Sequence, residues 1–248
     1  MGIGEIRVGV GGWTYPPWRG PFYPPGLRQA DELAFAASRL GAIEINGTAY
    51  RLQKAESFAK WAEAVPPGFA FTIKASYFCT NRKILSDAQG AIDRFFAQGL
   101  DALGDTLGPI LWQFAPTKAF DPADFARFLS FLPRDVNGQR LRHAIEVRHE
   151  SFDVPDFVAM ARDHGVAIVA ADSPKYPRIY ERTADFTYAR LLCASENEPA
   201  GYSGDALDRW ADTARRWAEG GEAYIFFING AKVRAPAAAE ALIARLQS

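Results

Sequence analysis

The sequence predicts an α/β fold, a single (β/α)8 barrel of the TIM type that occupies residues 1–248. Strand-like and helix-like segments alternate along the chain, and no linker or change of composition divides them. Parallel strands joined by helices close into barrels in chains of about this length. Hydrophobic residues make up 48% of the chain and charged residues 23%, which is typical of a globular protein with a large core.

The chain opens with a short strand and a stiff aromatic loop. Val8 and Val10 alternate in a strand-like run that ends in glycines, and the prolines that follow, up to Pro25, exclude both helix and strand. The loop carries five aromatic rings, at Trp13, Tyr15, Trp18, Phe22 and Tyr23. So much apolar surface must fold back onto the barrel. Whether it forms one wall of a cavity or a plug of the core remains open.

The other elements follow in alternation. Further strands are predicted at 42–46, 69–75, 109–113, 143–148, 166–170, 186–191 and 223–228. Helices are predicted at 31–40, 55–64, 87–103, 122–131, 155–164, 205–218 and 236–246. Asp121 precedes Pro122 as a helix N-cap, and Gly41 and Gly165 follow helices as C-caps. Only a short proline-containing segment lies between 172 and 185, so we expect the sixth helix to be irregular or absent.

Polar side chains of one parity recur in three of the predicted strands. Glu44 alternates with isoleucines, and Lys74 and Glu146 alternate with apolar residues in the same way. Because the apolar parity must face the helices, we expect the polar side chains to point into the barrel or its mouth. Each lies near the carboxyl end of its strand, which is where barrel enzymes place their chemistry.

The candidate catalytic residues are therefore Glu44, Glu146 and Lys74. One glutamate would act as acid and the other as base, a pairing suited to glycoside or similar hydrolysis. Lys74 is placed where a barrel could use a Schiff-base amine, although most lysines in pockets are counter-ions. The alternative for the whole set is a neutralising network of ion pairs inside the barrel.

Ten further residues are candidates for contact with a ligand. They are Trp13, Tyr15, Asn46, Tyr50, Arg51, Gln113, Arg148, Asp172, Arg190 and Asn229. Lys74, Arg148 and Arg190 would hold an anionic group such as a phosphate or carboxylate, and Trp13 and Tyr15 would stack on a sugar or base. The predicted partner is a small anionic or sugar-like ligand.

The sequence indicates no particular cofactor. Three histidines and two unpaired cysteines do not provide the ligand spacing of a zinc site. A divalent ion held by Glu44, Glu146 and Asp172 is conceivable because such ions take carboxylate oxygens, but Lys74 and Arg148 would repel it. We therefore assign no metal site.

The overall charge and the cysteine content limit the partners and the compartment. A net charge of −1 and a pI near 6.3 do not indicate a nucleic-acid or membrane-surface binder. Cys79 and Cys193 form no disulfide framework, which favours a reducing cytoplasm. The segment 1–6 lacks the features of a signal peptide, and no apolar run is long enough to span a bilayer.

Four strings resemble the family of domains of unknown function 72, also called YecE-like. They cover Gly11–Gly20, Glu44–Arg51, Ile145–His149 and Tyr224–Asn229. The resemblance implies a TIM-type barrel with a polar pocket at one end and no agreed activity. The chain departs from the family pattern at Asn81, where Thr-His is usual, and at Leu192, where the family carries Arg-x-His-Gly. If those histidines act in relatives, this chain does something different or nothing.

Three functions follow from these observations. The first is an enzyme that acts on a small anionic or sugar-like ligand at the carboxyl ends of the strands. The second is a nucleic-acid-associated protein whose aromatic loop stacks on bases, although the net charge does not indicate it. The third is a non-catalytic ligand-binding barrel, which the replacement of the family histidines by Asn81 and Leu192 favours.

Overall fold

A computed structural model describes residues 4–248 and contains one large parallel sheet. Its strands are β1 (Ile6–Gly11), β2 (Ala42–Ile45), β3 (Ala70–Lys74), β4 (Leu107–Gln113), β7 (His143–Glu146), β8 (Ala167–Ile168), β9 (Ala170–Asp172), β10 (Phe186–Leu191) and β11 (Glu222–Phe227). Their order is β8-β7-β4-β3-β2-β1-β11-β10-β9, and every pairing is parallel. Residues 1–3, part of the segment expected to lack a signal peptide, lie outside the described residues.

The sheet closes through its sixth strand, which is broken. β8 pairs with β7 and β9 pairs with β10, and only Val169 separates β8 from β9. The Val169 backbone N–H donates to the Ile145 carbonyl at 2.9 Å, which keeps the break attached to β7. Counting β8 and β9 as one strand gives eight around the ring, so the predicted (β/α)8 barrel is confirmed.

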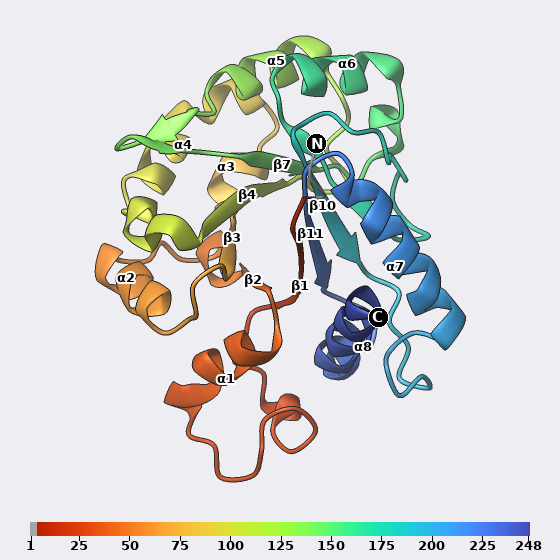
Figure 1. The fold of residues 1–248 in the computed structure, drawn as a ribbon. Helices are drawn as coiled ribbons and strands as arrows, with labels where there is room; N and C mark the ends of the chain where they lie inside the picture. Colours follow the sequence, from red (N-terminus) through yellow and green to blue (C-terminus); the bar gives the residue numbers. More distant parts are fainter. Residues whose placement is uncertain (1–3) are drawn as a thin grey trace.

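Helices form an outer layer around the strands (Figure 1). They are α1 (Glu32–Arg39), α2 (Ala55–Glu63), α3 (Tyr77–Thr80), α4 (Gln89–Phe96), α5 (Pro122–Ser130), α6 (Pro155–Asp163), α7 (Gly204–Ala218) and α8 (Ala235–Gln247). A two-stranded hairpin, β5 (Asp135–Val136) and β6 (Gln139–Arg140), precedes β7. In the described chain no helix connects β9 to β10, as the proline-containing sequence there predicts.

The third predicted helix is the clearest difference from the sequence-based prediction. The expected helix at 87–103 is α4 followed by a 3-10 segment at Leu100–Thr106. α4 already ends at Phe96, and Gly99, with a left-handed φ of 86°, turns the chain before the 3-10 segment so that the two do not join into one helix. The apolar periodicity continues past this glycine, which is why the sequence alone suggested one longer helix.

Two apolar cores lie on either side of the strands. The outer core, between strands and helices, includes Ile43, Ile73 and Ile145, which have the apolar parity predicted for that side. The inner core combines small alanines with large rings, among them Tyr188 and Phe226. Small and large side chains together fill the barrel interior, so it is a packed core whose polar groups gather at its carboxyl end.

The aromatic loop packs as core. Trp18 and Tyr23 are fully buried, and the Trp18 Nε1–H donates to the carbonyl of Lys232 at 2.9 Å. The Tyr23 hydroxyl donates to the Trp13 carbonyl at 2.5 Å, and the Trp13 ring lies 5.2 Å from that of Trp61 on α2. Of the two possibilities left open by the sequence, the loop therefore plugs the outer core.

The described residues contain no helix with both the length and the apolar character required to cross a membrane.

Candidate functional site

A network of ion pairs crosses the barrel at the carboxyl ends of its strands. Glu44 on β2 and Arg190 on β10 face each other inside the barrel, and both are buried. The Arg190 Nε donates to Glu44 Oε2 at 3.0 Å and its Nη2 donates to Glu44 Oε1 at 2.9 Å. This two-pronged geometry is the strongest that arginine makes with a carboxylate. The interaction joins two strands that β1 and β11 separate in the ring.

Glu146 on β7 extends the network. Its Oε2 accepts a hydrogen bond from Arg190 Nη1, and its Oε1 accepts one from Arg148 Nε at 2.6 Å. Gln113, at the end of β4, accepts from the same Arg190 Nη1 at 3.2 Å. Arg190 thus links three strands to its own, and both oxygens of each glutamate are occupied.

The network favours the ionised forms of Glu146 and Arg190. Burial alone would raise the pKa of Glu146, but the Arg190 and Arg148 guanidiniums outweigh it and hold this pKa below the usual range. Burial would likewise lower the pKa of Arg190, and the carboxylates of Glu146 and Glu44 raise it instead. The structural alternative, a network of mutually neutralising ion pairs, accounts for these four side chains.

Lys74 is the cation that the network leaves over. It ends β3, is 6% exposed, and in the described part of the chain has no carboxylate oxygen within 4.0 Å. Its Nζ donates to the Tyr77 hydroxyl at 3.2 Å and lies 5.0 Å from the centre of that ring. Burial and the nearby Arg190 lower the pKa of Lys74, and the two glutamates oppose them only in part. Two carboxylates therefore face three cations.

Arg148 lies at the border of an open hollow. Its guanidinium carbon is 4.6 Å from the centre of the Tyr176 ring. The hollow has a volume of about 440 Å³, and segments that follow β4, β7 and β9 form its walls. Arg148 thus connects the buried network to space large enough for a small ligand.

Tyr188 and Tyr77 belong to the site although the sequence analysis did not select them. The Tyr188 hydroxyl donates to Glu44 Oε2 at 2.8 Å and lies 2.9 Å from the Thr72 hydroxyl. Tyr188 has the same parity as Arg190 on β10, so alternation could have identified it. Tyr77 comes after the end of β3, where parity no longer applies.

Several predicted ligand residues lie away from the network. Asp172 shares its parity with the outward-facing Ala170, and its Oδ2 accepts from Tyr202 at 3.1 Å. Asn229 is exposed, and Arg51 is exposed beside Tyr50. The aromatic pair predicted to stack on a ligand is engaged elsewhere: Trp13 packs on Trp61, and Tyr15 packs on Trp18 and lies under Lys232.

Two predicted residues lie at the edge of the site. The Tyr50 ring is 71% exposed and contacts Tyr77 edge-on, with 5.0 Å between ring centres. Asn46 donates to the Glu44 carbonyl at 3.4 Å and lies above Gly11, where a Cβ atom would come within 2.8 Å of the Asn46 amide nitrogen. Tyr50 can contact a ligand at the mouth, whereas Asn46 supports the end of β2.

The metal possibility receives no support from the geometry. Asp172 points outward, while Glu44 and Glu146 are bound to Arg190. Residues 4–248 contain no group of three or more His, Cys, Asp or Glu side chains that could hold a metal ion. Arg190 occupies the place between the two glutamates that a cation would need.

A profile of the family described as "Protein of unknown function DUF72" matches residues 7–248. The chain belongs to the DUF72 family. The resemblance seen in four short strings is thus confirmed over nearly the whole chain. No curated protein matches the sequence.

Solved structures of DUF72 proteins share the fold. A DUF72 family protein from Thermotoga maritima is 22% identical, with a TM-score of 0.80 over 98% of this chain and 100% of the other. One from Enterococcus faecalis is 16% identical, with a TM-score of 0.73 over 98% and 96% of the two chains. A D-psicose 3-epimerase, solved in the presence of D-fructose, is 13% identical, with a TM-score of 0.51 over 97% and 96%. At these identities the likeness shows the fold alone.

Proposed function

We propose that this DUF72 protein is an enzyme that acts on a small anionic ligand at the carboxyl ends of the barrel strands. One observation carries the proposal: the buried network holds three cations against two carboxylates, and the carboxylates are already paired. The remaining positive charge is best balanced by a negatively charged ligand. Lys74 and Arg148 are the side chains that would hold it.

Within this proposal, Lys74 is also the group that transfers a proton. A buried ammonium whose pKa is lowered gives up its proton more readily near neutral pH, as general acid–base catalysis requires. The Tyr77 hydroxyl, 3.2 Å from Nζ, offers a route for that proton toward the exposed Tyr50, whose hydroxyl is 3.4 Å further on.

The two glutamates are assigned a positioning role. The paired-carboxylate mechanism predicted from the sequence needs one neutral carboxyl group, and the two guanidiniums on Glu146 oppose its protonation. Glu44 directs both of its oxygens at Arg190. Both glutamates therefore hold Arg190 across the barrel, and Arg190 keeps the environment of Lys74 positive.

The barrel fold is one that enzymes use, and it does not identify a reaction. The barrels with TM-scores of 0.50–0.51 are named as an epimerase, a homocysteine methyltransferase and a xylanase. A sugar-like ligand with an anionic group fits the expected chemistry as well as a simple carboxylate does. A cytoplasmic location remains part of the proposal, and the free thiols of Cys79 and Cys193 agree with it.

The nucleic-acid alternative has less support. Trp18 and Tyr23 are buried and have no free face on which a base could stack, and Trp13 already packs edge-to-face with Trp61. A non-catalytic binding barrel differs from the proposed enzyme only in lacking turnover, and the same experiment separates the two.

The experiment compares Lys74→Met, which removes the positive charge, with Lys74→Arg, which keeps the charge but does not release its proton. Organic acids and sugar acids are screened by thermal shift, and compounds that bind are assayed for turnover. We expect Lys74→Met to lose binding by at least tenfold, and Lys74→Arg to keep binding but lose turnover. Arg28→Met, which removes an exposed cation with an 80% accessible side chain, is the matched control.

Two outcomes would contradict the proposal. Binding unchanged in Lys74→Met would remove Lys74 from the site. Full turnover by Lys74→Arg would exclude Lys74 as the acid–base group. If the wild-type protein binds organic anions and turns over none of them, the function is that of a binding barrel. Unchanged turnover in Glu146→Gln would remove the positioning role assigned to that glutamate.

A further inference from the structure

A large cavity lies outside the ion-pair network. Its volume is about 770 Å³, and its walls come from the segments that follow β3 and β4 and from the first turns of α5. None of Glu44, Lys74, Glu146, Arg148 and Arg190 lines it. A hollow of this volume has room for a molecule the size of a nucleotide.

Cations predominate among the charged groups of this β3–β4 cavity. Arg82, Lys83, Lys118 and Arg127 line it, together with two acidic residues, Asp121 and Asp124. Lys118 donates to Asp124 Oδ2 at 2.9 Å. In the described residues none of the other three cations has a carboxylate oxygen within 4.0 Å.

Both carboxylates are already committed to the backbone. Asp124 accepts hydrogen bonds from the N–H groups of Leu85 at 2.9 Å and Ser86 at 2.8 Å. Asp121 caps α5 by accepting from the N–H groups of Ala123 and Asp124, both at 3.1 Å. They fix the walls of the cavity and leave Arg82, Lys83 and Arg127 without a carboxylate partner.

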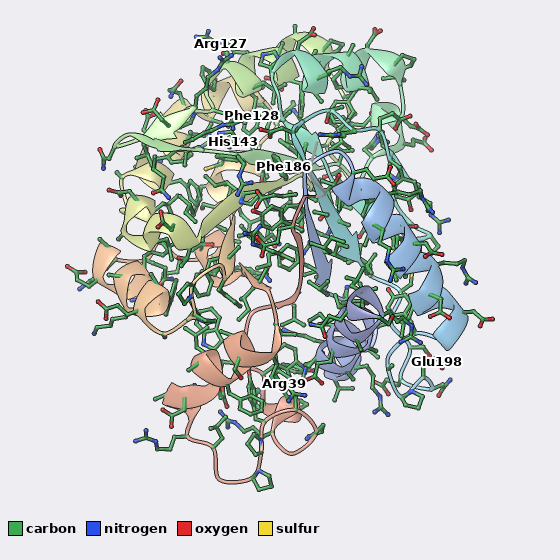
Figure 2. The ribbon with its side chains drawn as sticks, viewed as in Figure 1. Arg39, Arg127, Phe128, His143, Phe186 and Glu198 are labelled. Atoms are coloured by element: carbon green, nitrogen blue, oxygen red, sulfur yellow. The ribbon has the colours of Figure 1, made fainter. Side chains whose placement is uncertain are left out.

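Three of the four cations are held in place. The Arg82 Nε donates to the Phe78 carbonyl at 2.5 Å, and the Lys118 Nζ donates to the Lys83 carbonyl at 2.9 Å. The Arg127 guanidinium carbon lies 4.8 Å from the centre of the Phe131 ring. In Figure 2 Arg127 projects from the outer side of α5, while Phe128 of the same helix points inward. Arg82 and Arg127, the two of these that have no carboxylate partner in the described residues, therefore lose less entropy when they bind an anion.

The rest of the wall offers groups suited to an organic phosphate. Thr80, Ser86 and Thr117 contribute hydroxyls, and Ile84 and Ala115 contribute apolar surface. A single phosphate group would fill little of the volume and would leave most of the cations unpaired. Phosphate oxygens pair well with arginine, and lysine binds them as a point charge.

We propose that the β3–β4 cavity binds an organic diphosphate of about the size of a nucleoside diphosphate, with its phosphates on Arg82, Lys83 and Arg127. A nucleic-acid strand fits less well because the chain has a net charge of −1 and binding along a strand requires an extended basic track. This site is independent of the function proposed for Lys74.

The test is isothermal titration calorimetry with ADP, pyrophosphate and adenosine as probes at low ionic strength. The double variant Lys83→Met/Arg127→Met removes two exposed cations from the cavity wall. Lys60→Met/Arg216→Met removes two exposed cations of the same types from α2 and α7 and is the matched control. We expect ADP and pyrophosphate to bind the wild type, with affinity at least tenfold lower in the cavity variant and unchanged in the control.

Other results would overturn the proposal. The proposal is wrong if ADP does not bind at millimolar concentration, or if the cavity variant binds ADP with the same affinity as the wild type. Loss of ADP binding in Lys74→Met would place the ligand in the other site. Adenosine binding as tightly as ADP would show that the phosphates are not recognised. Tighter binding of a single-stranded oligonucleotide than of ADP would assign the surface to nucleic acid instead.

Discussion

Replacement of Arg190 by methionine should destabilise the fold at neutral pH. Arg190 donates to both buried glutamates, so its loss leaves Glu44 with Tyr188 alone and Glu146 with Arg148 alone. Removal of one partner of a buried ion pair typically costs about 3–5 kcal/mol, because the other charge stays buried. At about 2–4 °C per kcal/mol for a chain of this size, the melting temperature should fall by roughly 10 °C.

The same substitution should have a weaker effect in acid. In the wild type the pKa of Glu146 is lowered, so its contribution to stability is present above the ordinary glutamate pKa and is lost as the pH falls through the lowered value. Arg190→Met removes the stronger of the two charges that lower that pKa, so the pKa rises from its wild-type value. The variant can then protonate the glutamate and relieve the uncompensated charge, so the difference in unfolding free energy should shrink toward pH 4.

The assay is urea unfolding of both proteins at pH 7 and pH 4.5, with the slope m checked for constancy. Arg140→Met is the control, because the Arg140–Asp185 pair is exposed and such pairs contribute about 1 kcal/mol or less. A loss below about 1 kcal/mol for Arg190→Met, or one that does not change with pH, would refute the argument that the buried carboxylates depend on this guanidinium.

Three further predictions concern the scaffold. The His143 ring accepts a hydrogen bond from Trp112 and donates one to the Pro133 carbonyl, and burial lowers its pKa from 6.5 to about 4. The free energy of unfolding should therefore fall by about 3 kcal/mol between pH 6.5 and pH 4. Urea unfolding of His143→Gln should lack this pH dependence, and the same fall in variant and wild type would contradict the prediction. Gly9→Ala should lower the free energy of unfolding by about 3 kcal/mol or more, because its Cβ would lie 1.9 Å from the Ala42 carbonyl oxygen. Gly47 has open space around it, so Gly47→Ala should cause no such loss. Equal melting temperatures of the two variants would contradict this prediction. Trp18→Ala should cost about 3–5 kcal/mol by thermal unfolding, and a loss under 1 kcal/mol would show that the aromatic loop is not core.

The fold could be predicted because its signals are local. Alternation of strand and helix patterns identified the barrel, and the Pro-containing segment after Asp172 correctly predicted a connection without a helix. The break at Val169 between β8 and β9 could not be predicted, because it depends on pairing with two different neighbours. α4 ends at Phe96 and the backbone turns at Gly99, although the apolar pattern continues.

The site could be predicted only in part. Parity placed Glu44, Lys74, Glu146 and Arg190 inside one ring, because side-chain alternation is a property of each strand by itself. It did not reveal which charges pair, since that depends on distances across the barrel. Asp172 was misplaced because it follows the break at Val169, and the sequence gives no sign that its parity is outward.

The packing of the aromatic loop and the β3–β4 cavity could not be predicted from the sequence for the same reason. The rings of the loop could equally have lined a cavity or packed as core, and only their contacts decide. The cations of the cavity come from different loops and from α5, with no common spacing in the sequence. Groups of this kind become recognisable only when the fold brings them together.

The proposed function requires one positive charge more than the buried carboxylates balance, at Lys74 beside the paired Arg148. Anomalous diffraction from crystals soaked in selenate would detect an anion drawn to that charge. The charge count predicts an anomalous peak in hydrogen-bond contact with the Lys74 Nζ or the Arg148 guanidinium, and its disappearance in Lys74→Met. A wild-type crystal that binds selenate on its surface and none beside these two side chains would contradict the claim.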